Sequence, residues 1–298
     1  MSSDDSLIQI RKGRGLSQTQ TTLPEPKQFV FDLDETIGSF SDLYILFQCI
    51  DHFQNEYDIV LYDDVSILVS QMLQLYPEFF RHGIEIVMEY LHNKKAAGAC
   101  SGVYIYTNNS CIPDTWPCFI TNFIETNWNL PGLFDSVIRA FKINGNLIDQ
   151  RRNTSEKTHS ELLRCLILPR NTEFCYLDNE HYPKMEHRYV YYLQPRPYHH
   201  YLNNTIILER FIKSELGHHM AHLLKADLYH ILPGWYTHRG YSLNVYRPID
   251  IDIDLHISKR ILKYVCKFFS MTRKHPYTRH RRTSSMNTTH KIRSVGRF

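Results

Sequence analysis

The sequence predicts an α/β protein whose core is an open, parallel, Rossmann-like sheet flanked by helices. Three short apolar runs carry this prediction, at residues 28–31, 103–106 and 173–177. Each run has the length of a buried strand and is rich in aromatic or β-branched residues. Stretches with helical spacing separate the runs, and strands that alternate with helices are typical of parallel sheets. A further run at 189–193 predicts a fourth strand.

Helices are expected in the segments between and after these strands. Over 83–95, apolar side chains recur at spacings of three and four residues, which is the helical period. Over 153–166, Asn153, Thr154 or Ser155 is the expected N-cap. The complete set of expected helical segments is 42–54, 64–75, 83–95, 153–166, 205–232 and 256–269.

Composition divides the chain into four parts. Residues 1–27 are polar and include a Gln/Thr run, so we expect a disordered leader. Residues 28–200 contain the strands and are the expected core, with a small helical cap inserted at about 37–80. Residues 201–270 are expected to form a mostly helical C-terminal extension, and residues 271–298 a basic disordered tail.

Charge is unevenly distributed along the chain. The formal net charge is +3, while residues 271–298 contain eight Lys and Arg and no acidic residue. Subtracting +8 from +3 leaves −5 for residues 1–270. The basic tail predicts nucleic acid or another polyanion as a partner, and the alternative interpretations are a solvated tail or a localisation signal.

The cysteine pattern and the N-terminus bear on the compartment. Seven cysteines occur, which is an odd number, and no C-x-x-C pair is present. This pattern weighs against a disulfide framework or a zinc ribbon and favours a reducing compartment. The N-terminal residues do not resemble a secretory signal, and no run of apolar residues is long enough to span a membrane. We therefore expect a soluble intracellular protein, cytoplasmic or nuclear, with no membrane partner.

Polar clusters directly follow the three best-defined strands. The carboxyl ends of parallel strands meet at one edge of a sheet, so side chains that follow them are expected to lie close together. The three clusters are Asp32-Leu33-Asp34-Glu35-Thr36, Thr107-Asn108-Asn109 and Asp178-Asn179.

Asp32 and Asp34 indicate the chemistry of this site. Two neighbouring carboxylates need a counter-charge, and Mg²⁺ supplies one and prefers oxygen ligands. Asp178 and Asn179 would add further oxygens. A carboxylate such as Asp32 can attack a phosphate and form an aspartyl-phosphate intermediate, while Asp34 protonates the leaving oxygen and then activates water. The sequence therefore predicts a magnesium-dependent phosphatase.

These motifs resemble those of the haloacid dehalogenase superfamily. FDLDET at 31–36 is similar to its D-x-D-x-T signature, YIYTNN at 104–109 to its second motif, and YLDNE at 176–180 to its fourth. The Asp-Asn pair is most like the phosphatases of the RNA polymerase C-terminal domain, and the chain also looks like phosphatase-like proteins of large DNA viruses. The resemblance covers roughly residues 28–195.

The resemblance implies roles for individual residues. The third motif of the family is a lysine before the last strand, which we assign to Lys157 rather than Lys142. Lys157 stands 21 residues before Asp178, which leaves room for a helix, a turn and a strand. The expected catalytic residues are Asp32 as nucleophile, Asp34 as acid and base, Thr107 as phosphoryl hydrogen-bond donor, and Lys157. The expected substrate-binding residues are Thr36, Thr107, Asn108 and Lys157, and the expected metal ligands are Asp32, the Asp34 carbonyl, Asp178 and Asn179, with Glu180 as an alternative to Asn179.

The size of the cap bears on the substrate. An insertion of about 40 residues makes a modest lid, and a modest lid favours a bulky substrate that reaches an open cleft. We expect a phosphoprotein that carries phosphoserine or phosphothreonine. The alternatives are a phosphatase for nucleotides or nucleic-acid ends, and a catalytically weak protein that binds phosphate. The presence of both Asp32 and Asp34 weighs against the last alternative.

Further patterns fall outside this scheme. The histidines at 218–222 are interpreted as a helix-surface cluster rather than a metal site. The alternating aspartates at 250–254 predict an edge strand with a solvated carboxylate face. Cys111 and Cys118 follow the second motif and are candidates for a redox pair. The tyrosines at 189–201 are interpreted as core packing.

Overall fold

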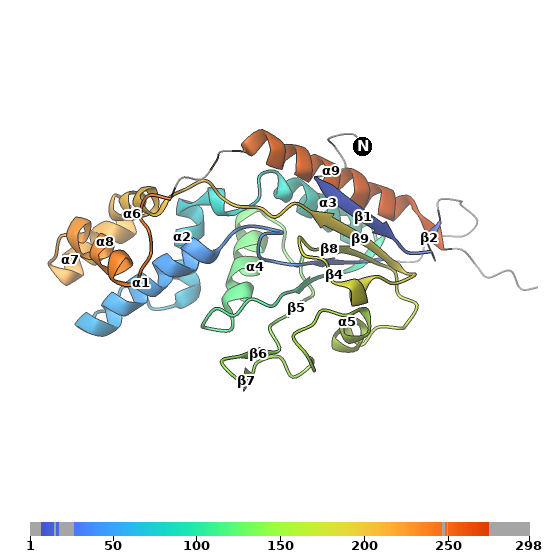
Figure 1. Ribbon diagram of the computed structural model, residues 1–298, viewed down its shortest axis with the longest axis horizontal. Coiled ribbons are helices and arrows are strands. Elements are labelled where there is room, and N and C mark those ends of the chain that lie inside the picture. The colour runs from blue at the N-terminus through green and yellow to red at the C-terminus, as the bar shows by residue number, and fades with distance from the viewer. Residues whose placement is uncertain (1–6, 15, 18–26, 246–247, 249, 274–298) are drawn as a thin grey trace, which may run out of the picture.

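A computed structural model describes residues 7–14, 16–17, 27–245, 248 and 250–273. The fold is mixed α/β, with a mostly parallel sheet flanked by helices, and is compatible with a Rossmann-like architecture (Figure 1). The strands are β1 (Ile8–Lys12), β2 (Leu16–Ser17), β3 (Lys27–Phe31), β4 (Cys100–Tyr106), β5 (Ser136–Ile138), β6 (Lys142–Ile143), β7 (Asn146–Leu147), β8 (Phe174–Leu177), β9 (Val190–Pro195) and β10 (Thr272–Arg273). The helices are α1 (Ser41–Tyr57), α2 (Val65–Leu75), α3 (Ile84–Ala96), α4 (Trp116–Asn127), α5 (His159–Leu166), α6 (Asn204–Ile212), α7 (Glu215–Leu224), α8 (Leu228–His238) and α9 (Ile251–Ser270), with short 3₁₀ turns η2 (Pro77–Phe79) and η3 (Pro183–Met185).

The main sheet of the described chain has six strands in the order β1-β9-β8-β3-β4-β5. β9, β8, β3, β4 and β5 are parallel, and β1 pairs with β9 in the antiparallel direction at the edge. β3 therefore lies between β8 and β4, and the carboxyl ends of these three strands are neighbours. This order places the three polar clusters of the sequence side by side.

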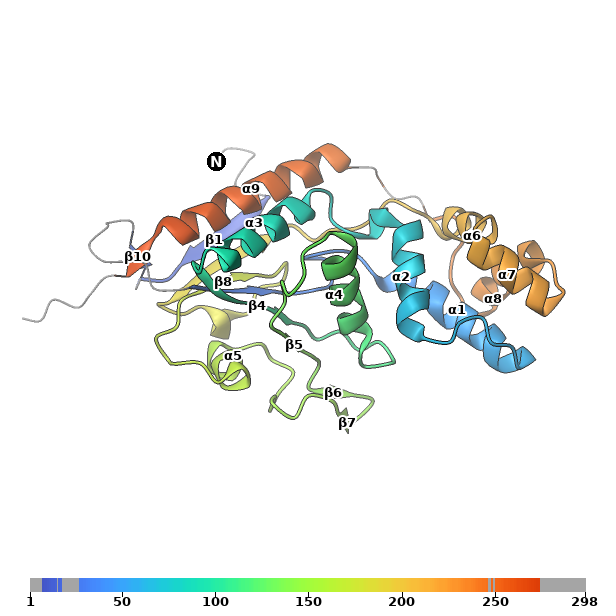
Figure 2. The same cartoon turned by 180° about the vertical axis from the view of Figure 1, so that it is seen from behind.

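Both faces of the central strand β3 are covered, which explains why its sequence is a continuous apolar run. Phe29 and Phe31 belong to the larger core, and Val30 belongs to a smaller core on the opposite face. The larger core includes side chains of α3, α4 and α9, whereas α5 contributes Leu162 and Leu163 to the smaller core. Figure 2 shows α3 and α9 lying side by side along the sheet.

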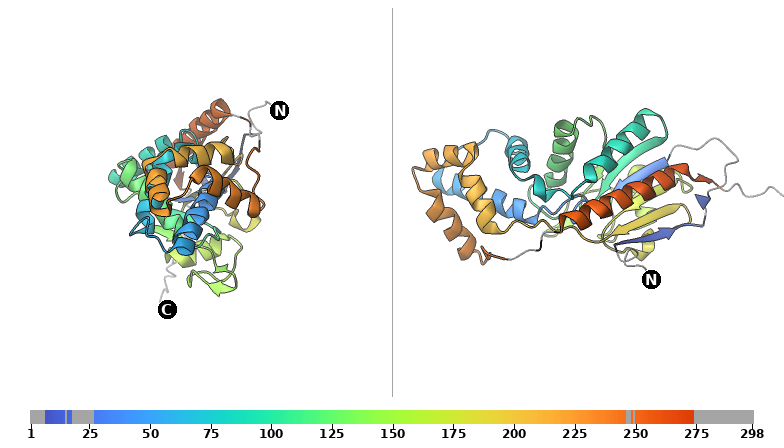
Figure 3. Two further views of the ribbon diagram at one scale, coloured as in Figure 1. Left: turned by 90° about the vertical axis from the view of Figure 1, so that its left-hand side faces the viewer. Right: turned by 90° about the horizontal axis from the view of Figure 1, so that it is seen from above.

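A lobe of helices stands at one end of the sheet, and we call α1, α2, α6, α7 and α8 together the helical lobe (Figures 1 and 3). Two distant parts of the chain build it. The Tyr76 hydroxyl donates to the Ile207 carbonyl oxygen across 2.6 Å, and Arg210 Nη1 lies 2.8 Å from Glu78 Oε2. The inserted helices after β3 and the helices after β9 thus pack as one unit, while α9 returns to the core.

The predicted disordered leader is wrong for the residues of it that the structure describes. Ile8–Lys12 form β1, whose backbone pairs with β9 from Ile8 opposite Pro195 to Lys12 opposite Tyr191. Ile8 is buried, so this strand is held by an apolar side chain as well as by its ladder. Residues 1–6, 15 and 18–26 lie outside the described part of the chain.

One predicted helix start is also wrong. The helix expected from 153 begins at His159, because Thr158 is the N-cap and its hydroxyl accepts from the Glu161 amide across 3.1 Å. The segment 205–232 is helical as expected, and it is divided into three helices because Ser214 and Asp227 cap α7 and α8 with their side chains. Local side-chain to backbone hydrogen bonds interrupt the helical pattern at these positions.

The predicted edge strand at 250–254 is the first turn of α9. Asp250 precedes the helix, and Asp252 and Asp254 lie in its first turn, where carboxylates suit the positive end of the helix dipole. Asp254 starts a buried stripe that continues at helical spacing through Ile257, Ile261 and Val265. The longer helical period therefore outweighs the short alternation. Of the predicted tail, residues 272–273 form β10, and 274–298 lie outside the described residues.

Candidate active site

A cavity of about 340 Å³ opens at the carboxyl ends of β3, β4 and β8. Asp32 continues the ladder beyond β3, because its amide donates to the Leu177 carbonyl oxygen across 2.8 Å. The Thr107 and Asp178 amides donate to the next strands in the same way. The residues that line the cavity are Asp32, Asp34, Glu35, Ser41, Thr107, Asn108, Asn109, Ser110, Cys111, Lys157, Asp178, Asn179, Glu180 and Tyr182.

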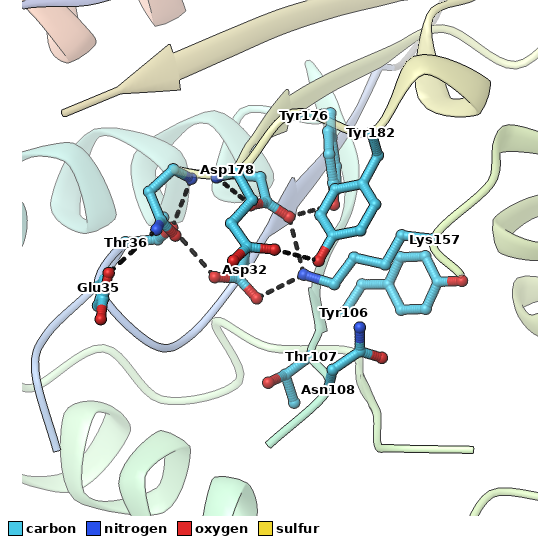
Figure 4. Close-up of polar contacts among 12 residues, drawn as sticks. Asp32, Glu35, Thr36, Tyr106, Thr107, Asn108, Lys157, Tyr176, Asp178 and Tyr182 are labelled. Atoms are coloured by element: carbon cyan, nitrogen blue, oxygen red, sulfur yellow. Dashed lines mark hydrogen bonds and ion pairs between the residues drawn. The ribbon is translucent and has the colours of Figure 1, made fainter. Parts of the chain in front are cut away.

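Lys157 joins the first and last polar clusters (Figure 4). Its ammonium lies 2.5 Å from Asp32 Oδ1 and 2.8 Å from Asp178 Oδ2, and all three side chains are buried. Lys142, the rival position, lies in the exposed hairpin of β6 and β7. The structure thus brings together the lysine and the two aspartates that the sequence selected.

Both carboxylate oxygens of Asp178 accept hydrogen bonds from protein donors. Its Oδ2 atom accepts from Lys157 and also from the Tyr176 hydroxyl across 2.5 Å, and its Oδ1 atom accepts from the Glu180 amide across 2.8 Å. These contacts fix the carboxylate beside Lys157. Asp178 therefore orients the ammonium toward Asp32.

The site has more acidic side chains than basic ones. Asp32, Asp34 and Asp178 carry three carboxylates against the single ammonium of Lys157. Burial raises the pKa of Asp32 to about 8, with the Lys157 charge opposing the rise and Asp178 and Asp34 adding to it. Burial alone would lower the pKa of Lys157, but Asp178 and Asp32 outweigh it and raise that pKa. A divalent cation would supply the missing positive charge.

Asp34 faces the cavity from the turn after β3. The backbone of Glu35 has a φ of 58°, and this left-handed turn separates the Asp34 side chain from the strand direction. The Asn109 side chain donates to Asp34 Oδ2 across 3.0 Å, which connects this carboxyl group to the loop after β4. Burial raises the pKa of Asp34, and the hydrogen bond from Asn109 opposes the rise.

Asn179 meets several oxygen atoms. In the orientation with Oδ1 toward Thr36, that oxygen accepts from the Thr36 hydroxyl across 2.8 Å. The same atom position lies 3.0 Å from the Asp34 carbonyl oxygen and 3.3 Å from Asp32 Oδ2. With the amide turned over, its nitrogen would donate to both of these oxygens and to the Thr36 hydroxyl oxygen 2.8 Å away. Adjacent oxygen ligands of Mg²⁺ at 2.0–2.1 Å stand about 2.9 Å apart. The two separations from Asn179, 3.0 and 3.3 Å, are close to this value, and a hard cation held by these oxygens would favour the oxygen-inward orientation of Asn179.

Three of the predicted substrate-binding residues have protein partners of their own. Thr36 is fully buried, and its hydroxyl contacts Asp32 and Asn179 rather than the cavity. Asn108 Oδ1 accepts from Arg152 across 2.8 Å, and its Nδ2 donates to the Ser155 carbonyl oxygen across 3.0 Å. Thr107 is 1% exposed, and its hydroxyl oxygen accepts from the Asn109 amide. Lys157, the fourth, pairs with Asp32 and Asp178 and lines the cavity together with Thr107 and Asn108.

Arg152 is a site residue that the sequence prediction missed. It is 1% exposed, and its Nη1 atom lies 3.1 Å from the Thr107 carbonyl oxygen, 2.8 Å from Asn108 Oδ1 and 3.0 Å from the Arg139 carbonyl oxygen. Its guanidinium also covers the Tyr106 ring, with 4.8 Å from Cζ to the ring centroid. Arg152 thus supports the loop after β4 from behind. The feature of the sequence that could have drawn attention to Arg152 is its position five residues before Lys157.

Arg81 gives the same support to the loop after β3. It is 1% exposed and donates to the carbonyl oxygens of Thr36, Glu35 and Arg196, at 2.7, 2.7 and 2.8 Å. Its Nη1 atom lies 3.9 Å from Asp254 Oδ1 on α9. Nothing in the local sequence around Arg81 marks it for this role, because its partners come from distant segments.

The remaining sequence candidates lie elsewhere or lack activation. His218, His219 and His222 are exposed on α7. Cys111 lines the cavity, but burial raises its pKa to about 12 and also raises that of Cys118, so neither thiol is activated. All seven cysteines lie in the described part of the chain and are free.

Comparisons with protein-family models, with curated proteins and with solved structures found no match. Within the described ranges, no group of three or more His, Cys, Asp or Glu side chains is arranged to hold a metal ion. The oxygens that converge at Asn179 include a backbone carbonyl and an amide, so they differ in kind from such a group. Of the described helices, none is long and apolar enough to cross a membrane.

Proposed function

We propose that the protein is a magnesium-dependent phosphomonoester hydrolase that carries the phosphoryl group on Asp32. One observation carries this proposal: Lys157 lies between Asp32 and Asp178 in an open cavity that Asp34, Thr107 and Asn179 also line. A carboxylate held beside an ammonium and a second carboxyl group is the arrangement that aspartyl-phosphate chemistry requires. The proposal agrees with the resemblance to the haloacid dehalogenase superfamily.

Asp32 is the proposed nucleophile, and its carboxylate is oriented by Lys157 at Oδ1 and by the Thr36 hydroxyl at Oδ2. In the first step a bond forms between one Asp32 carboxylate oxygen and phosphorus while the bond from phosphorus to the leaving oxygen breaks. The Asp34 carboxyl group gives its proton to that oxygen, so the alcohol leaves neutral. Asn109 holds the Asp34 side chain in place, and Lys157 offsets the negative charge of the phosphoryl oxygens.

In the second step water attacks the phosphorus of the aspartyl phosphate. Asp34, now a carboxylate, takes the proton from the water as the new bond forms. The bond between phosphorus and Asp32 breaks, and Asp32 returns as a carboxylate with inorganic phosphate released. Atoms and charge therefore balance with water as the only co-substrate.

Asp32, the Asp34 carbonyl oxygen and Asn179 are the residues that would hold the metal ion. Mg²⁺ at this position would neutralise charge on the transferring phosphoryl group and offset the excess of carboxylates. Asp178 remains a further candidate ligand through Oδ1, which accepts from the Glu180 amide alone.

A phosphoprotein is the proposed substrate, because the cavity is open and little of it is covered. Among the described residues that line it, Ser41 alone comes from the helical lobe. A site with so small a lid admits a phosphorylated side chain that projects from a polypeptide, whereas a small metabolite is usually enclosed.

Phosphate release from p-nitrophenyl phosphate with and without Mg²⁺ tests the chemistry. The Asp32→Asn variant should lose turnover, while Asp63→Asn, an exposed carboxylate outside the cavity, should keep it. Acid-quenched wild-type enzyme should carry an alkali-labile phosphoryl group that Asp32→Asn lacks. Turnover by Asp32→Asn at the wild-type rate would overturn the mechanism.

A substrate panel tests the proposed substrate class separately. Phosphoserine and phosphothreonine peptides, mononucleotides and 5′-phosphorylated oligonucleotides would be compared by kcat/KM. The proposal expects the peptides to be preferred. Preference for nucleotides or oligonucleotides would keep the chemistry and replace the substrate, and no turnover of any member would support a phosphate-binding role instead.

A further inference from the structure

A second cavity adjoins the candidate active site, and we call it the side cavity. Its volume is about 430 Å³, and Glu35 and Ser41 line both cavities. Figure 4 shows Glu35 on the side of the site away from Lys157, so the side cavity continues the candidate active site in that direction. The start of α9 and the segment after β9 supply other parts of its wall. A substrate that reaches Asp32 is therefore beside the side cavity as well.

Carboxylates predominate over guanidinium groups among the described residues that line the side cavity. Two of its four carboxylates have close partners, because Asp250 lies 2.9 Å from Arg196 and Asp42 lies 3.1 Å from the ring of His200. The four carboxylates are Glu35, Asp42, Asp250 and Asp254. The first and the last of these have no cationic group of a described residue within hydrogen-bond distance.

Asp254 is a buried carboxylate in the wall of the side cavity. It is 6% exposed, and no residue that the structure describes donates a hydrogen bond to its side chain. Arg81 Nη1 lies 3.9 Å from Asp254 Oδ1 and itself has no hydrogen-bond partner among the described residues. Burial raises the pKa of Asp254, and the charge of Arg81 opposes the rise. A donor that entered the side cavity would therefore satisfy a carboxylate that has lost most of its water.

Asp254 lies close to the loop that follows β3. Arg81 Nη2 donates to the Glu35 carbonyl oxygen across 2.7 Å, while Nη1 of the same guanidinium lies beside Asp254. One guanidinium group therefore separates Asp254 from the turn that follows Asp34. An extended polypeptide advances roughly 3.3 Å per residue. A substrate residue two or three positions from the phosphorylated one would thus lie at the side cavity.

We propose that the side cavity binds a lysine or arginine side chain that stands two or three residues from the phosphorylated residue of a protein substrate. This inference rests on the proposed phosphatase function, since it names a second residue of the same substrate. Asp254 would accept from the cationic group, and the partly exposed Glu35 between the two cavities would attract it. The same carboxylates repel a phosphodiester chain, which favours a basic phosphoprotein over a nucleic-acid end.

Fluorescence anisotropy of the full-length protein with labelled peptides and Mg²⁺ tests the proposal. Each peptide carries a difluoromethylene phosphonate in place of phosphoserine, so binding is measured without turnover. One set has a single lysine two or three residues before or after the phosphonate, and the reference peptide has glutamine at all of these positions. The best lysine peptide should bind roughly tenfold more tightly than the reference, as a charge-assisted hydrogen bond predicts. The gain should shrink as KCl rises from about 50 to about 300 mM.

Asp254→Asn should abolish the preference for lysine, because the amide carries no charge. The matched control is Asp252→Asn, which makes the same change at an exposed position in the same turn of α9, outside the side cavity, and should keep the preference. Glu35→Gln should reduce the preference without touching the buried contacts of α9, which covers the case that Asp254→Asn does not fold. Affinities for the two peptides are compared within each variant, so a uniform loss of binding through Arg81 leaves the ratio unchanged.

Equal affinity of the wild type for the lysine and glutamine peptides, or failure to bind either, would overturn the proposal. Equal loss of the preference in Asp254→Asn and Asp252→Asn would also overturn it, because net charge alone would then explain the effect. Turnover of p-nitrophenyl phosphate, measured alongside, tests the proposed function separately. Turnover without a preference for lysine would keep the chemistry and remove this role of the side cavity. A preference for lysine without turnover would keep the side cavity as part of a phosphate-binding site and remove the hydrolase.

Discussion

The Arg152 guanidinium donates to the side-chain oxygen of Asn108 across 2.8 Å and so holds the loop after β4 from the inside of the protein. Asn108 is exposed, yet its amide is held at both ends, by Arg152 and by the Ser155 carbonyl oxygen. Ser155 lies two residues before Lys157. The position of Thr107 in the cavity is thus linked to the position of Lys157.

Arg152→Lys should lower kcat/KM while the protein stays folded. A lysine keeps the charge, but it lacks the planar guanidinium that covers the Tyr106 ring and the Nε atom that lies 3.5 Å from Glu161 Oε2, so the loop after β4 is no longer fixed. Displacement of this loop should lower kcat/KM on a phosphopeptide by roughly 10- to 100-fold. Circular dichroism and thermal melting would check folding, and Arg164→Lys, an exposed arginine on α5, is the control. An unchanged kcat/KM would remove Arg152 from the site.

Asp34→Asn should separate the two chemical steps. The amide cannot protonate a leaving oxygen or activate water, so turnover should fall by about 10²- to 10⁴-fold. With p-nitrophenyl phosphate, whose leaving group needs little protonation, the first step should continue and phosphoenzyme should accumulate. Acid quench followed by mass spectrometry of the Asp32 peptide would detect it. A variant that loses turnover without any phosphorylated Asp32 would contradict this division of roles.

Asn179→Ala should weaken metal binding. The variant removes one of three converging oxygens, and the Mg²⁺ concentration at half-maximal activity should rise roughly 10- to 100-fold. Calorimetric titration of the free protein with Mg²⁺ gives a readout that does not require turnover. Asn171→Ala, a residue in the turn before β8, is the control. Equal Mg²⁺ affinity in Asn179→Ala and the wild type would place the cation elsewhere.

His159 should make the fold sensitive to acid. Burial, with a smaller contribution from His187, lowers its pKa to about 4, against an ordinary value of 6.5. The two rings stack with their centroids 3.8 Å apart. Because the folded-state pKa is depressed, this contribution to stability is complete above pH 6.5 and is lost as the pH falls toward 4.

The size of this effect is on the order of 1–2 kcal/mol, because solvent screens a ring that is not fully enclosed. Urea unfolding at pH 7.5, 6, 5 and 4.5 would measure it. His159→Phe should flatten the dependence, and His238→Phe, on the exposed end of α8, should not. A parallel pH dependence in the wild type and His159→Phe would rule out this titration.

Much of the sheet was predictable because its strands have a simple local signature. The runs before Asp32, Thr107 and Asp178 are apolar on both faces, and each ends at polar side chains. Parallel topology then brings those ends together without any further information. Lys157 was predicted from the resemblance, which implies a lysine before the last strand, together with its spacing to Asp178.

The residues that support the site were not predictable in the same way. Arg81 and Arg152 act by donating to backbone carbonyl groups, and a carbonyl group has no signature in the sequence. β1 was missed because its stability comes from pairing with β9, more than 170 residues away. The start of α9 was misread because three alternating aspartates look like a strand until the whole helix is considered.

The helical lobe is drawn from two separate parts of the chain, and this has a consequence for how substrates enter. Between β3 and α9 the backbone enters the lobe twice, after β3 and after β9. It returns to the core twice, before α3 and before α9. A body tethered by four connections cannot swing open like a domain on a single hinge. Under the proposed function, a substrate would therefore meet a cavity that the lobe does not close, because Ser41 alone of the described lining residues comes from it.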